Sequence, residues 1–202
     1  MIGGVGLIAC GVLGMLRTSL PGGFGPFSAW NMMVIVTGVI YAAAVLLFAI
    51  GTSAHGSVVA RRPLGVVTMA IVAVWPLVDT AANLVFSQDE STFGAWTTYA
   101  YVALVVQTGA ALVAATQIGR AGVVPAPWCW APLVILGFQA FAWAVPQIVF
   151  VSLGSDAIAN LADLYVLMST LAGLAGTLGL GILALVLAAQ QRPESVEVYR
   201  SV

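Results

Sequence analysis

The residues best placed to do chemistry are a carboxylate and an amide inside an apolar stretch. The segment WPLVDTAANLVF, residues 75–86, carries Asp79 and, one helical turn later, Asn83. Its surroundings are apolar enough to cross a membrane, where a charged carboxylate costs roughly 2.5–3.5 kcal/mol on insertion scales. Trp75, Asp79 and Asn83 are spaced i, i+4 and i+8, so they form one stripe on a helix. We expect this stripe to face other helices rather than lipid.

Two interpretations of Asp79 remain open from the sequence. In the functional one it is a proton-titrating or substrate-binding carboxylate, since ionisable residues inside membranes commonly mark substrate and ion pathways. In the structural one it is a carboxyl group that only packs helices, either protonated or bonded to Asn83, Gln107 or Arg17. A partner for Asp79 from a neighbouring span is expected in both cases.

Other polar residues are predicted in the same half of the membrane as Asp79. A second stripe contains Gln139, Trp143 and Gln147 beside Pro146, whose missing N–H frees a carbonyl one turn back. Arg17 is the cation expected nearest to Asp79 or Asp163. These residues predict a polar pocket that opens to the extracytoplasmic side. Its candidate ligand-binding residues are Asp79, Asn83, Gln107, Gln139, Gln147 and Arg17.

Several kinds of chemistry lack the residues they need. The chain contains no lysine for a retinal-type Schiff base, and its single histidine, His55, excludes bis-histidine haem and multi-histidine metal sites. Serine nucleophiles have no basic partner within reach. An aspartyl pair would need Asp79 and Asp163 to face each other, but Asp163 is predicted near the membrane interface. We therefore expect no cofactor and no metal, and an enzyme is the least favoured class.

Composition identifies a membrane protein. The 202 residues are 61% hydrophobic and 6% charged, whereas soluble domains have about 25% charged residues. Unpaired backbone groups are costly in lipid, so apolar runs of spanning length must be helices. There is no basic run that would attract nucleic acid, and the lipid bilayer is the expected partner.

We predict an all-α, six-helix transmembrane bundle with one domain over residues 1–190 and a short tail over 191–202. The predicted spans are about 2–20, 28–52, 64–86, 97–119, 128–152 and 162–189. The first is the weakest because its apolar part ends at Arg17, after only about 22 Å of helix. It crosses the membrane only if Arg17 reaches the interface. We interpret it as a retained helix, since it lacks the basic start and the cleavage site of a signal peptide.

The arginines predict the orientation, because basic residues are retained in cytoplasmic loops. Five of the six fall in alternate connections or the tail, at Arg61, Arg62, Arg120, Arg192 and Arg200. Both termini are then cytoplasmic, and Arg17 is the single exception. Trp30 and Trp96 fit an outer interfacial belt. The lysine-free composition favours a bacterial cytoplasmic membrane.

Small residues recur at helical spacing in the first and last spans. Gly6, Cys10 and Gly14 form one such set, and Ser169, Gly173, Thr177 and Gly181 form another. Stripes of this kind let helix backbones approach closely. The last-span stripe predicts helix packing, with docking of a second copy or of a partner subunit as a further use. Cys10 and Cys129 are predicted at different depths, which argues against a disulfide.

The leading functional hypothesis is binding or transport of a small solute, an ion or a proton at the pocket around Asp79. The alternative is a structural accessory subunit of a larger membrane complex, in which the polar residues only pack helices.

Overall fold

The fold is known from a computed structural model, and every regular element in its described part is a helix. The described residues are 2–18, 29–51, 59, 62–85, 93–122, 124, 125, 128–153 and 161–190. The helices are α1 (Ile2–Thr18), α2 (Ala29–Ile50), α3 (Pro63–Val85), α4 (Phe93–Ala121), α5 (Ala131–Leu153), α7 (Ala162–Leu174) and α8 (Leu180–Gln190). A π-helical segment, η2 (Ala175–Gly179), joins α7 to α8. The predicted tail, residues 191–202, lies outside the described residues.

Among the described residues, five apolar helices are long enough to span a membrane. They are Trp30–Ile50, Pro63–Leu84, Gly94–Ala121, Ala131–Val149 and Ala162–Ala189. The last includes α7, η2 and α8 as one continuous rod. Helix α1 has 17 residues, or about 26 Å at 1.5 Å per residue, which is short of the roughly 30 Å hydrocarbon core. The described residues therefore contain six helical rods, five of which are long and apolar enough to span a membrane, and a membrane crossing by any of them, α1 included, stays a prediction.

The helix boundaries lie close to the predicted ones, with the largest difference at the start of the fourth span. Helix α4 begins at Phe93, whereas the sequence predicts a span from residue 97. Two helices end at glycines with positive φ, Gly51 at 71° and Gly122 at 67°. This left-handed conformation is easiest for glycine, and at Gly51 it lets the backbone N–H bond the Leu47 carbonyl at 2.9 Å.

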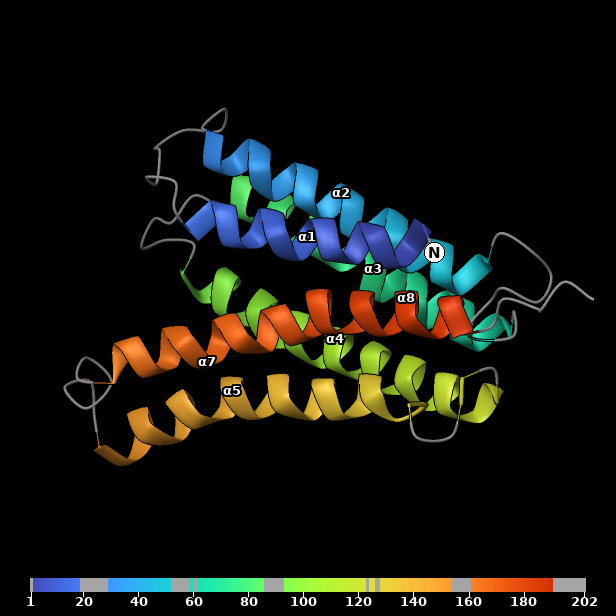
Figure 1. Cartoon of the computed structure of the whole chain (residues 1–202). Coiled ribbons are helices and arrows are strands. Elements are labelled where there is room, and N and C mark those ends of the chain that lie inside the picture. Colours follow the sequence, from blue (N-terminus) through green and yellow to red (C-terminus); the bar gives the residue numbers. More distant parts are fainter. Residues whose placement is uncertain are drawn as a thin grey trace, which may run out of the picture.

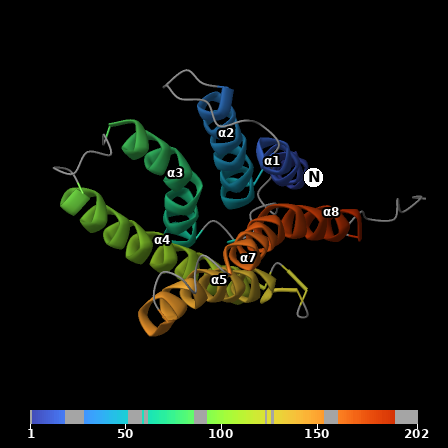
Figure 2. The ribbon, with the colours of Figure 1, turned by 90° about the vertical axis from the view of Figure 1, so that its left-hand side faces the viewer.

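Each helix packs against the next one in the chain, and the last returns to the first. Contacts join α1 to α2, α2 to α3, α3 to α4, α4 to α5 and α5 to α7, while α8 and η2 pack on α1. Figure 1 shows α5 and α7 side by side along one edge of the bundle. Viewed from the end, α3 and α4 lie on one side and α1 and α8 on the other (Figure 2). The Asp79 helix therefore neighbours α2 and α4.

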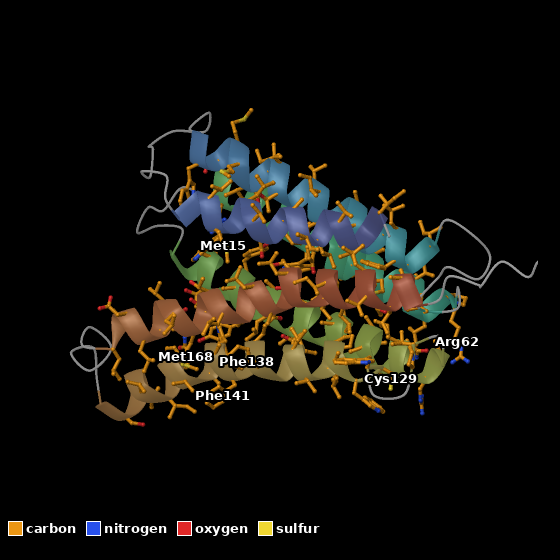
Figure 3. All side chains as sticks on the ribbon, viewed as in Figure 1. Met15, Arg62, Cys129, Phe138, Phe141 and Met168 are labelled. Carbon is orange, nitrogen blue, oxygen red and sulfur yellow. The ribbon has the colours of Figure 1, made fainter. Side chains whose placement is uncertain are left out.

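The largest buried cluster occupies one half of the bundle. It draws on the C-terminal halves of α2 and α4 and the N-terminal parts of α1 and α3, which share the end that carries Arg62 and Cys129 (Figure 3). Its buried members are Leu7, Ala42, Ala44, Val45, Ala49, Val59, Met69, Ala73, Ala114 and Ile118. Asp79 lies in the other half of α3, where fewer residues are buried.

Helix α1 packs through glycines on two of its faces. Toward α2, a Cβ added at Gly6 would lie 2.9 Å from the Cβ of Ala44. Toward α8, a Cβ at Gly181 would lie 2.9 Å from the carbonyl oxygen of Gly4, and one at Gly11 would lie 3.0 Å from Thr177 Oγ1. Close backbone contact of this kind is the usual role of small residues between membrane helices.

Two of the four residues in the predicted last-span stripe therefore pack against another helix of the same chain. Thr177 and Gly181 pack on α1, whereas a Cβ added at Gly173 would meet no atom within 4 Å. Ser169 is exposed. Cys10 and Cys129 are both buried and free.

Candidate functional site

Asp79 lies on the face of α3 that packs against other helices. Thr68, Trp75 and Ala82 recur every seven residues and share that face with Asp79. Thr68 and Ala82 are 7% and 9% exposed, respectively. One flank of α3 carries exposed valines, namely Val67, Val74 and Val78, with Val78 about 100° around the helix from Asp79. This exposed flank is apolar, and the carboxylate does not lie on it.

The side chain that meets Asp79 is Tyr99 of α4. Its hydroxyl donates a hydrogen bond of 2.7 Å to Asp79 Oδ1. The expectation of a polar neighbour from an adjacent span is confirmed at this contact, but the neighbour is Tyr99 rather than Gln107. Both residues are half-buried, and an O–H donor on a carboxylate makes a strong, charge-assisted bond when the carboxylate is ionised.

Chain geometry explains why these two residues meet. Helices α3 and α4 are consecutive and pack on each other, and Asp79 and Tyr99 are each ten residues from position 89, the midpoint of their connection. In an antiparallel helix pair, residues equidistant from the turn lie at the same depth, since each residue rises about 1.5 Å. Asp79 is about 9 Å below the end of α3 by the same measure.

Asn83 binds the backbone rather than the carboxylate. Its Nδ2 donates to the Asp79 carbonyl oxygen at 2.8 Å, one turn back along the helix. Thr80 Oγ1 makes the equivalent bond to the Pro76 carbonyl at 2.7 Å. Pro76 stays inside a continuous helix. These local bonds leave the Asp79 carboxylate with one described hydrogen-bond partner, Tyr99.

Aromatic residues lie within about one helical turn of the Asp79 depth on both α3 and α4. Trp96 and Tyr99 are neighbours on α4, with ring centroids 5.6 Å apart and planes inclined by 31°. Trp75 lies one turn deeper than Asp79 on α3. Its Nε1 is buried and has no hydrogen-bond partner among the described residues. Trp75 therefore turns its polar edge into the bundle.

Arg17 lies over a tryptophan and not beside a carboxylate. Its guanidinium carbon is 4.7 Å from the centroid of the Trp30 ring, an arrangement in which the ring quadrupole attracts the cation. Within the described part of the chain, Arg17 forms no ion pair with Asp79 or Asp163. The charge of Asp79 is consequently not compensated by this arginine.

The glutamines lie on other helix contacts. Gln139 of α5 donates to the Ala172 carbonyl at 3.5 Å, and its Nε2 would be 2.7 Å from a Cβ added at Gly176. It therefore belongs to the contact of α5 with α7 and η2. Gln107 and Gln147 are exposed, and neither bonds another described residue.

Gln107 nevertheless shares a face with Tyr99. Ala103 and Ala110, the buried residues one turn to either side of it, are each 8% exposed. Gln107 itself lies in a run of exposed residues, 105–109, so this turn of α4 is not covered by another described helix. The six predicted site residues are thus distributed: Asp79, Asn83 and Gln107 lie on α3 and α4, Arg17 lies with α2, and Gln139 and Gln147 lie on α5.

A separate groove between α5 and α7 is apolar. It is lined by Val145, Pro146, Val149, Leu161, Leu164, Tyr165 and Met168. Met168 lies on the same part of the α5–α7 pair as Phe138 and Phe141 (Figure 3). No charged side chain lines this groove, so it is chemically unlike the Asp79 site. Across the described ranges, no three His, Cys, Asp or Glu side chains are grouped as metal ligands would be.

Sequence reasoning missed Tyr99 and assigned Trp96 only to an interfacial belt. An aromatic residue near a helix end commonly lies in an interfacial belt. That interpretation left out the contact of Trp96 with the Tyr99 ring. The available signal was positional, because Tyr99 mirrors Asp79 about the short connection and shares a face with Ala103 and Gln107.

Comparison with known proteins adds no further constraint. No protein-family model matches the chain, no curated protein matches it, and no solved structure matches it. The Asp79–Tyr99 contact and the helices that hold it are therefore the features that bear on function.

Proposed function

We propose that this multi-pass membrane protein binds or transports a small solute, an ion or a proton at the Asp79–Tyr99 contact. The observation that carries the proposal is the 2.7 Å bond between the Tyr99 hydroxyl and Asp79 Oδ1. It holds one carboxylate oxygen and leaves the second without a described partner. A carboxylate kept in this way inside a membrane is costly unless a proton, a cation or water compensates it.

The packing around the contact supports a site that exchanges with water. The main buried cluster lies in the other half of the bundle, and Asn83 and Gln107, on either side of the Asp79 depth, are both exposed. Access is proposed from the extracytoplasmic side. Arg62 directly precedes α3, and Arg120 lies in the last turn of α4, both at the helix ends away from Asp79, and arginines favour the cytoplasmic side. The proposed location is a bacterial cytoplasmic membrane.

An accessory-subunit role is the alternative, and a specific observation favours it. Gly173 has open space where a Cβ would stand, and Ser169 is exposed one turn away. This part of the last span is available to a helix of a second copy or of a partner subunit. In that role the Asp79–Tyr99 bond would only hold α3 against α4.

Thermal unfolding of the purified protein in detergent tests the proposal. A panel of cationic, anionic and neutral small solutes is added over a range of pH to the wild type, to Asp79→Asn and to Asp163→Asn. A ligand that binds the folded state raises the unfolding temperature by mass action. Asp79→Asn keeps the size and hydrogen-bonding capacity of the side chain but removes its charge and its titration.

The proposal predicts at least one solute or pH effect that is present in the wild type, absent in Asp79→Asn and retained in Asp163→Asn. Asp163 is the matched control because it is an exposed carboxylate in the first turn of α7. If the responses of the wild type and Asp79→Asn are identical across the panel, the accessory-subunit role is the better account.

A further inference from the structure

We propose that the ligand of the Asp79 site is an organic cation, that is, a molecule with an ammonium group that carries apolar substituents. This inference rests on the proposed function and names the class of ligand for the same site. Two features carry it: the uncompensated carboxylate, and the aromatic rings placed one turn above and one turn below its depth.

The charge of the site calls for a cation. Tyr99 is a neutral hydrogen-bond donor to Asp79, and it stabilises the carboxylate without cancelling its charge. The guanidinium of Arg17 is held over Trp30, and no ion pair to Asp79 exists within the described residues. A ligand with one positive charge would compensate Asp79, whereas an anion would be repelled by it.

The aromatic residues select the kind of cation. Trp96 and Tyr99 form a pair with centroids 5.6 Å apart, and Trp96 lies about 4.5 Å farther along the α4 axis than Tyr99. Trp75 lies about 6 Å deeper than Asp79 along α3. Faces of tryptophan and tyrosine attract ammonium groups, and the rings also cover apolar substituents. The Arg17–Trp30 contact, at 4.7 Å, is an example of the same interaction in this molecule.

The set of donor atoms does not suit a hard metal ion. Ca²⁺ takes six to eight oxygen ligands, and Mg²⁺ demands octahedral oxygen geometry. Around Asp79, the Tyr99 hydroxyl donates a hydrogen bond to the carboxylate, and Thr80 and Asn83 bind backbone carbonyls. One carboxylate oxygen is left without a described partner, and the aromatic residues Trp75, Trp96 and Tyr99 lie within one helical turn of its depth. This combination matches a quaternary or tertiary ammonium group, which is held by one negative charge and by ring faces.

Binding of choline by the purified full-length protein tests this inference. Titration calorimetry in detergent, at constant ionic strength, compares choline with its uncharged carbon analogue 3,3-dimethylbutan-1-ol. The two molecules have similar shape and differ in charge. We expect choline to bind at least about tenfold more tightly, because cation–π and carboxylate contacts together contribute differences of this order.

Variants assign the selectivity to the site. Asp79→Asn is expected to weaken choline binding about tenfold and to leave the neutral analogue unchanged, while Trp96→Leu is expected to weaken it roughly fivefold. The matched controls are Asp163→Asn and Trp143→Leu, the latter removing a tryptophan of α5 that is 46% exposed. Both controls are expected to bind choline as the wild type does.

The outcomes separate this inference from the proposed function. Equal affinity of the wild type for choline and for its neutral analogue, or no binding of choline, overturns the organic-cation inference, and this comparison needs no variant to fold. If other solutes or protons still act through Asp79, the proposed function stands and only the organic-cation inference fails. If no solute and no pH effect depends on Asp79, both fail together.

Discussion

The contact of α1 with α8 and the contact of α3 with α4 join helices in opposite ways. At the first, Gly4 and Gly181 bring two backbones together, and a Cβ at Gly181 would lie 2.9 Å from a carbonyl oxygen and 3.1 Å from the Ile8 backbone nitrogen. At the second, Asp79 and Tyr99 bridge the helices through side chains. Where backbones touch there is no room for a ligand. Where polar side chains span the gap, a ligand can replace or join them.

The two contacts also differ in what holds them. The α1–α8 contact depends on shape alone, since dispersion between closely packed atoms is the main attraction between helices in lipid. The α3–α4 contact at the Asp79 depth depends on a polar bond and on aromatic rings. We therefore expect substitutions at the first to change stability and substitutions at the second to change binding.

The largest effect on stability is expected from Gly181→Ala. The added Cβ would meet the backbone of α1, which cannot move aside as a side chain can, and overpacking of this kind costs about 1–3 kcal/mol. Gly173→Ala is the matched control in the same rod, because its Cβ would meet no atom within 4 Å. Thermal unfolding in detergent measures both. Equal unfolding temperatures for the two variants would show that the α1–α8 contact is loose.

A smaller effect is expected from Tyr99→Phe. This substitution removes the hydroxyl that donates to Asp79 and keeps the ring, so the loss is that of one hydrogen bond, about 0.5–1.5 kcal/mol. Asp79→Asn retains an acceptor for the same hydroxyl and is expected to unfold close to the wild type. Chemical unfolding of the three proteins checks the ranking. A large loss of stability in Asp79→Asn would favour a structural role for the carboxylate.

The smallest effect is expected from Gln139→Leu. The bond from Gln139 to the Ala172 carbonyl is 3.5 Å long, which is at the weak limit for a hydrogen bond. Leucine fills a similar space beside η2, so we expect a change in the free energy of unfolding of less than about 0.5 kcal/mol. If Gln139→Leu instead destabilises the protein as much as Gly181→Ala, the α5–α7 contact contributes more to the fold than its geometry indicates.

The sequence predicted the helices well and the contacts between them poorly. Apolar runs broken by short polar connections fix the helices within a few residues, because lipid enforces helix on every spanning segment. Small residues are present in several helices, so the spacing of Thr177 and Gly181 could not identify α1 as their neighbour. The π-helical turn Ala175–Gly179 was also unpredicted, since no proline or charged residue marks it.

The candidate site was predicted in part. Helical spacing places Trp75, Asp79 and Asn83 on one stripe, and the expected direction toward other helices holds at Asp79, which contacts Tyr99, whereas Asn83 is exposed. The partner Tyr99 does not follow from helical spacing, because the polar character of a tyrosine depends on where its hydroxyl points. Grouping Arg17, Gln139 and Gln147 with Asp79 used depth alone. Depth does not determine which helices are neighbours: in the structure Arg17 lies over Trp30, Gln139 contacts the last span, and Gln147 is exposed.

Cysteine labelling in intact cells tests most directly whether the Asp79 depth is open to extracytoplasmic water. In a background of Cys10→Ala and Cys129→Ala, the variants Asn83→Cys and Val78→Cys are exposed to a charged, membrane-impermeant maleimide. Asn83 is exposed on the same face as Asp79, whereas Val78, one residue before Asp79, is 39% exposed on the apolar flank of α3 that also carries Val67 and Val74. A thiol covered by lipid does not ionise or meet a charged reagent. We predict that Asn83→Cys reacts in intact cells and that Val78→Cys does not. Equal reaction at both positions, or reaction of Asn83→Cys only after permeabilisation, would contradict a hydrated site that opens outward.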